Sequence, residues 1–109
     1  MIRVTVYKRI TDQSFKGFRV LGHAEYADPG KDIVCAAVSA LTTNFVNSVE
    51  TFTDEKFLLR TDEERGLIAF KFQKAPGHDA VLFMRSWIMG LEAILQEHSD
   101  CIRLLFKEV

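Results

Sequence analysis

Alternating apolar and polar positions open the chain and indicate a β-hairpin. Within residues 2–8 an isoleucine and two valines occupy every second position, which is typical of a strand buried on one side. Residues 11–14 are polar and predict a turn, and residues 15–21 return to an apolar strand pattern. We therefore expect the two strands to pair.

Beyond residue 32 the apolar period lengthens to three and four residues, which predicts a helix. Its apolar face comprises Val34, Val38, Leu41, Phe45 and Val49. Asp32 is the expected N-cap, so that Cys35 would be the third helical residue, and the pattern ends near Thr51. Cys35, Ser39 and Thr42 fall on a neighbouring stripe, which would place the thiol above a short polar ladder.

Glycines bracket the segment between the second strand and this helix. Asp28-Pro29-Gly30 predicts a break in regular structure, and Gly22 follows the preceding strand. Residues 24–31 carry few apolar side chains to offset their ordering entropy. We therefore expect a mobile loop, with Gly22 and Gly30 as its hinges.

The second half of the chain repeats the order of the first and adds one strand. Residues 56–60 and 67–73 predict another hairpin, a helix is expected from its cap at Asp79 to about Glu97, and residues 101–107 alternate as a last strand. The order ββαββαβ predicts an α+β fold. We expect a two-layer α/β sandwich, in which two helices cover a mixed sheet.

Length and composition fit one folded domain that spans the whole chain. A chain of 109 residues can bury one two-layer core but not two. Its 48% hydrophobic and 27% charged residues are typical of a folded protein rather than a disordered one. The net charge is −1 and the sequence shows no stripe of Lys and Arg, so we expect no direct binding of nucleic acid.

No apolar run approaches the roughly 18 residues that a membrane-spanning helix needs, and residues 1–6 alternate like a strand rather than a signal peptide. These patterns predict a cytoplasmic protein without a membrane partner. In that compartment Cys35 and Cys101 stay reduced. A disulfide between them is the alternative.

Cys35 and His23 are the candidate catalytic residues. His23 ends the second strand, and Cys35 is expected at the start of the helix, where unpaired N–H groups and the helix dipole stabilise a thiolate. A histidine alongside can accept the thiol proton, and a cysteine with such a general base is sufficient for nucleophilic catalysis. The backbone N–H groups of Cys35 and Ala36 are candidates for stabilising an oxyanion.

The same residues have other interpretations. A lone cysteine beside an apolar helix face is commonly a packing residue, and the Asp32 carboxylate, if close, would oppose a thiolate. The sequence does not single out a residue that orients His23. Glu25, Asp28 and Asp32 are candidates by proximity, and Ser39 could reach either partner. We expect a dyad rather than a triad.

Nothing in the sequence predicts a metal or a cofactor. The cysteines and histidines are scattered, without a CxxC pair or two histidines one helical turn apart. Neither a phosphate-binding glycine loop nor a dinucleotide fingerprint occurs. We therefore expect neither a metal site nor a bound cofactor.

The chain carries two motifs at a specific separation: Gly22-His23-Ala24 and Gly30-Lys31-Asp32-Ile33-Val34-Cys35-Ala36-Ala37-Val38-Ser39. Together they resemble the signature of the ribosomal-processing cysteine proteases of Firmicutes and related bacteria, and the similarity in length and element order covers the whole chain. The resemblance implies a homodimer with a Cys/His dyad at Cys35 and His23. It also implies a substrate, a large-subunit ribosomal protein with an N-terminal extension, and a loop that orders around it. The further residues that we expect to act as hinges or to bind substrate are Gly22, Gly30, Asp32, Ala36 and Ser39.

Two other functions compete with this interpretation. The first is a non-enzymatic ribosome-assembly factor that binds a ribosomal protein and uses Cys35 only for packing. The second is a thiol acyltransferase or a redox sensor, in which Cys101 would be the resolving cysteine. A slowly alkylated Cys35 would favour the assembly factor.

Overall fold

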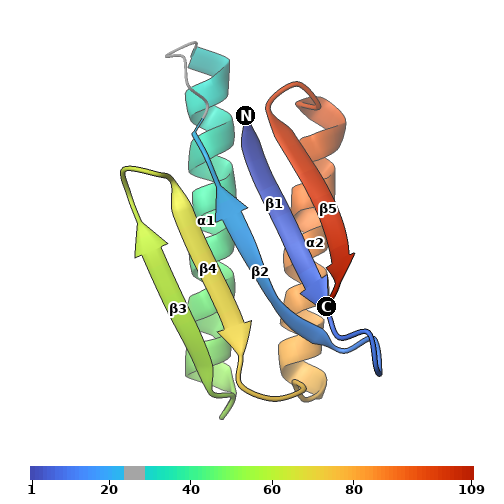
Figure 1. Cartoon of the computed structure of the whole chain (residues 1–109). Helices are drawn as coiled ribbons and strands as arrows, with labels where there is room; N and C mark the ends of the chain where they lie inside the picture. The colour runs from blue at the N-terminus through green and yellow to red at the C-terminus, as the bar shows by residue number, and fades with distance from the viewer. Residues whose placement is uncertain (24–28) are drawn as a thin grey trace.

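The computed structural model describes residues 1–23 and 29–109, and its elements follow the expected order (Figure 1). The ββαββαβ order and the α+β class are therefore confirmed. The elements are β1 (Ile2–Lys8), β2 (Phe15–Leu21), α1 (Pro29–Phe52), β3 (Phe57–Asp62), β4 (Leu67–Phe72), α2 (His78–Glu97) and β5 (Ile102–Glu108).

The strands form one mixed sheet in the order β3-β4-β2-β1-β5. The first and last strands of the chain, β1 and β5, run parallel, and the other neighbours are antiparallel. Both helices lie on the same face of the sheet, α1 behind β4 and β2 and α2 behind β1 and β5 (Figure 1). The result is the expected two-layer sandwich, with one sheet face covered and the other open.

An aromatic cluster forms the centre of the core between the layers. Phe18 stacks on Phe70 with 5.3 Å between ring centroids and lies 4.2 Å from Trp87. The Trp87 indole Nε1 donates to Thr42 Oγ1 at 3.1 Å, and that hydroxyl donates to the Val38 carbonyl at 2.7 Å. Thr42 is fully buried. It therefore belongs to the core, and the predicted polar ladder from Cys35 to Thr42 was wrong.

Both helices begin earlier than predicted. α1 begins at Pro29, so Asp32 lies in its first turn and is not the N-cap, and α2 has Gly77 rather than Asp79 as its N-cap. Proline suits the first position of a helix because its φ is already helical and its missing N–H would have no partner there. Gly30 consequently lies inside the first turn of α1 rather than before it, and its role as a hinge stays a prediction. The remainder of the predicted loop, residues 24–28, lies outside the described residues.

One helical segment in the described part of the chain, Ile33–Phe52, is long and apolar enough to cross a membrane, by length and composition alone. The apolar runs in the sequence did not predict such a segment. Its buried residues fall on one stripe, which packs against the sheet and includes Val38, Phe45 and Val49. This one-sided burial is what a two-layer fold requires of its core helix.

The open face of the sheet gathers basic residues, and we call it the basic face. Its exposed cations are Arg3, Arg19, Arg60, Lys71, Arg103 and Lys107. Among the described strand residues on this face Asp62 is the one acid, and none of these cations forms an ion pair with a described residue. The prediction that no Lys/Arg cluster forms was wrong, because alternation hides such a cluster in the sequence. The expectation of no nucleic-acid partner therefore rests on net charge alone.

Candidate active site

His23 directly follows a glycine whose backbone conformation is one that residues with a side chain rarely adopt. Gly22 has a φ of +103°, and a Cβ built there would lie 2.6 Å from the carbonyl oxygen of Met1. The Met1 amino nitrogen in turn donates to the His23 carbonyl at 3.1 Å. The end of β2 is thus held against the start of β1, and His23 is presented there with an exposed side chain.

The imidazole of His23 contacts the turn between β3 and β4. Its Nε2 lies 3.1 Å from the carbonyl oxygens of both Glu63 and Glu64. The neighbouring Gly22 N–H donates to the Arg65 carbonyl at 3.3 Å. The sequence predicted this turn as part of the second hairpin but not its contact with His23, because the two segments lie about 40 residues apart and the turn carries no recognised motif.

Cys35 is half-buried on α1 and packs against the edge of the core. Because α1 begins at Pro29, Cys35 lies in the second helical turn rather than the first. Only the first four N–H groups of a helix lack intrahelical partners, and the dipole effect fades beyond the first turn. The N–H groups of Cys35 and Ala36 are therefore not positioned as the predicted oxyanion donors, and the helix end supports a thiolate less than expected.

A cleft of about 440 Å³ brings the two candidate residues together. It lies between the end of β2, one side of α1 and the β3–β4 turn. The polar and glycine residues that line it are Gly22, His23, Cys35, Ser39, Thr43, Thr61, Asp62, Glu63 and Gly66. Cys35, Ser39 and Thr43 are spaced at four residues along α1, so Thr43 takes the place that the sequence analysis gave to Thr42.

The other residues expected at the site are less closely involved. Ala36 is exposed and is not among the residues that line the cleft. Gly30 and Asp32 lie in the first turn of α1. Glu25 and Asp28, two of the candidates for orienting His23, fall outside the described residues.

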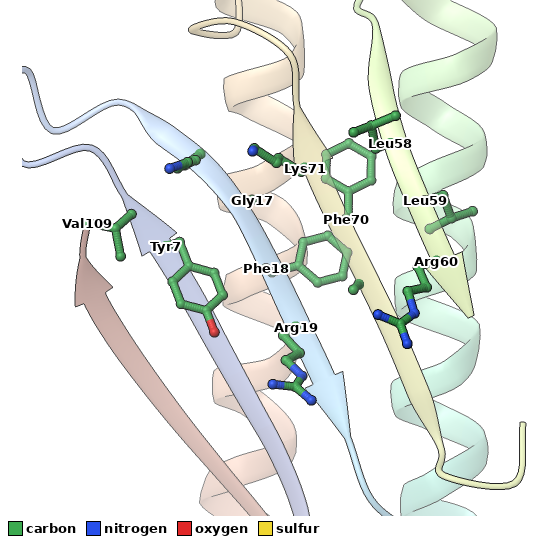
Figure 2. Close-up of a pocket in the computed structure, with 12 residues that line it drawn as sticks. Tyr7, Gly17, Phe18, Arg19, Leu58, Leu59, Arg60, Phe70, Lys71 and Val109 are labelled. Carbon is green, nitrogen blue, oxygen red and sulfur yellow. The ribbon is translucent and has the colours of Figure 1, made fainter. Parts of the chain in front are cut away.

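A second hollow, of about 410 Å³, opens on the basic face. Figure 2 shows Arg19, Arg60 and Lys71 around it, together with Tyr7. The residues that line it include no cysteine, histidine, aspartate or glutamate. The cleft that holds Cys35 and His23 is therefore the candidate active site.

The described residues contain no group of three His, Cys, Asp or Glu side chains that could hold a metal ion. No disulfide joins Cys35 to Cys101, so the alternative disulfide is not formed.

Comparison with known proteins places the chain in one family. The family model described as cysteine protease Prp matches residues 1–103. The ribosomal processing cysteine protease Prp of Bacillus subtilis (strain 168) is 32% identical over 108 residues, which cover 95% of this chain and 96% of the relative.

Solved structures agree with the sequence comparison. The essential ribosomal processing protease Prp from S. aureus in complex with a substrate peptide superposes with a TM-score of 0.90 at 26% identity, covering 98% of this chain and 100% of the other. The same protease in complex with a covalently linked product peptide gives a TM-score of 0.88 at 27% identity, with the same coverage. The resemblance of the two sequence motifs is thereby confirmed, and the chain belongs to the Prp family of cysteine proteases.

Proposed function

We propose that this cysteine protease removes the N-terminal extension of a large-subunit ribosomal protein, with Cys35 as its nucleophile and His23 as its base. The observation that carries the residue assignment is that both side chains line one cleft. The ribosomal substrate is supported by the relatives, which are ribosomal processing proteases.

The reaction follows from the chemistry of the pair. His23 takes the proton of the Cys35 thiol, and the thiolate sulfur attacks the scissile carbonyl carbon. The tetrahedral intermediate collapses to a thioester as His23 protonates the leaving amine. Water, deprotonated by His23, then attacks the thioester, which releases the carboxylate product and restores the thiol.

The sheet order indicates where an extended substrate would bind. β3 and β5 are the two edge strands, and β3 contributes Thr61 and Asp62 to the cleft. An extended peptide can add to an exposed strand edge through main-chain hydrogen bonds. We therefore place the substrate along the β3 edge, with its scissile bond in the cleft.

We further propose that the protein acts as a homodimer in the cytoplasm. The family resemblance supports the dimer, and a ribosomal protein substrate of the kind that the relatives process would be met in the cytoplasm. Sedimentation equilibrium of the purified chain tests the first proposal, and cell fractionation tests the second. A monomer across the micromolar range would contradict the dimer.

The decisive experiment offers the enzyme candidate ribosomal proteins with their N-terminal extensions intact and measures the product masses. We expect a single N-terminal cut in one of them. Cys35→Ala should abolish that cut while the variant stays folded, and Cys101→Ala is the matched control that should retain it. Cleavage by Cys35→Ala at the wild-type rate would overturn the nucleophile assignment.

Alkylation separates the protease from a binding factor. Cys101 is buried, with 5% of its surface exposed, and provides an internal standard for an unreactive thiol. We expect iodoacetamide to modify Cys35 much faster than Cys101. If iodoacetamide modifies Cys35 as slowly as Cys101, and the protein binds a ribosomal protein tightly without cutting it, a non-enzymatic assembly factor is favoured.

A further inference from the structure

The β3–β4 turn contacts the His23 ring through two main-chain carbonyl groups. We propose that the main chain of this turn positions His23, through the carbonyl oxygens of Glu63 and Glu64, and that it makes Nδ1 the nitrogen that accepts the thiol proton. Gly66 is the positioning residue that allows the contact. This inference rests on the proposed function, because it gives His23 the role of base.

The hydrogen-bond chemistry fixes the state of the ring. A carbonyl oxygen can only accept, so Nε2 must carry the hydrogen in its contacts with Glu63 and Glu64, each 3.1 Å long. A neutral imidazole has one N–H, and its lone pair is therefore on Nδ1. When Nδ1 takes the proton from Cys35 Sγ, the Nε2–H group keeps both acceptors, and the ring need not turn.

The acceptors are themselves held in place. Three consecutive carbonyl groups face the end of β2, because Arg65 accepts from the Gly22 N–H at 3.3 Å. Within the turn, the Gly66 N–H donates to the Glu63 carbonyl at 3.2 Å and the Arg65 N–H donates to Asp62 Oδ1 at 3.4 Å. Since the His23 side chain is exposed, packing alone does not fix its ring, and this turn supplies the orientation.

Gly66 allows the turn to approach this closely. Its φ is +61°, and a Cβ built there would lie 2.6 Å from the Gly22 carbonyl oxygen and 3.0 Å from His23 Cε1. The first distance is too short for any real Cβ, so a side chain must push the turn away from the end of β2. His23 would then lose the two carbonyl acceptors.

Nuclear magnetic resonance of the ring nitrogens tests the tautomer without any substrate. Long-range ¹H–¹⁵N correlation spectra of the full chain, labelled in histidine, distinguish Nε2–H from Nδ1–H at a pH where the ring is neutral. His78→Gln and His98→Gln assign the other two signals. We expect Nε2–H for His23, both in the wild type and in Cys35→Ala. An Nδ1–H tautomer would overturn the proposal.

Variants at Gly66 test the positioning itself. Gly66→Ala and Gly66→Asn should each lower kcat/KM by about 100-fold, the loss expected when a catalytic group moves by roughly 1 Å. Asparagine adopts positive φ more readily than alanine, so Gly66→Asn keeps the steric clash and relieves much of the backbone strain. Gly77→Ala is the control, because its Cβ would meet nothing within 4 Å.

Both Gly66 variants should also lose the hydrogen bonds that the His23 Nε2–H group donates to the turn, which is measured as faster exchange of that hydrogen with solvent in the folded protein. A wild-type rate in Gly66→Asn, or a lower rate with unchanged exchange of the Nε2–H hydrogen, would refute the positioning role. Failure of the proposed function gives a different result. If Cys35→Ala still cleaves, the nucleophile assignment fails, whereas the tautomer measurement is unaffected.

Discussion

Substitution of Gly22 by alanine should damage catalysis far more than folding. Holding alanine at a φ of +103° costs about 1–3 kcal/mol, and its Cβ would lie 2.6 Å from the Met1 carbonyl oxygen, so one of the two strands must move. A domain of this size loses roughly 4–8 °C in Tm per kcal/mol. The free energy of unfolding of natural domains is about 5–15 kcal/mol, which exceeds this cost, so the variant should remain folded at 25 °C.

The expected loss of rate is larger, because the residue that moves with Gly22 is His23. A displacement of about 1 Å can cost on the order of 100-fold in rate. The assay measures Tm by circular dichroism and kcat/KM at 25 °C on an extended ribosomal-protein peptide, with Gly77→Ala as the control. A wild-type rate, or a loss of rate that matches the unfolded fraction, would refute the reasoning.

Three further predictions concern pH and the core. The wild-type kcat/KM should rise and fall with pH at two values that belong to the Cys35–His23 pair, and His23→Ala should lose most of the rate and alter this profile; an unchanged profile would indicate another base. Thr42→Val leaves the buried indole N–H of Trp87 without its acceptor, so urea unfolding should show a loss of about 1–3 kcal/mol, and a loss within error would contradict that role. The pKa of the Asp12 carboxyl lies below its ordinary value of 3.8, chiefly through its hydrogen bond with the Ser14 side chain. The ionised Asp12 carboxyl therefore stabilises the fold above pH 3.8, and this stabilisation is lost as the pH falls through the lower pKa of the folded state. In Asp12→Asn the free energy of unfolding should consequently depend less on pH in this acid range.

Much of the fold could be predicted because the apolar period reports which side of an element is buried. The period of two in residues 2–8 and 15–21 and the later helical periods gave every element within a few residues. The two motifs around His23 and Cys35 likewise indicated the family. Each of these features is contained within a short stretch of residues, so it can be recognised from one sequence without knowledge of the fold.

The start of α1, the residue that lines the cleft below Ser39 and the contact of His23 could not be predicted, because the local sequence pattern fits more than one structure at each of them. Pro29 breaks a helix from within but also suits the first helical position, so the start of α1 was placed four residues too late. Thr42 and Thr43 are adjacent in sequence, yet one faces the Trp87 indole and the other the cleft. The contact between His23 and Glu63 joins segments 40 residues apart, and only the sheet order brings them together.

The basic face gives a nearly neutral molecule a polarised surface. With a net charge of −1 for the whole chain, the cations concentrated on one face require an excess of negative charge elsewhere. Such a molecule should bind a cation-exchange resin through that face at neutral pH, although its net charge predicts that it flows through, and Arg19→Glu should elute at lower salt. Two copies stacked sheet to sheet would bring like charges into opposition. The polarity of the surface therefore disfavours that arrangement and leaves the helical side and the strand edges for self-association.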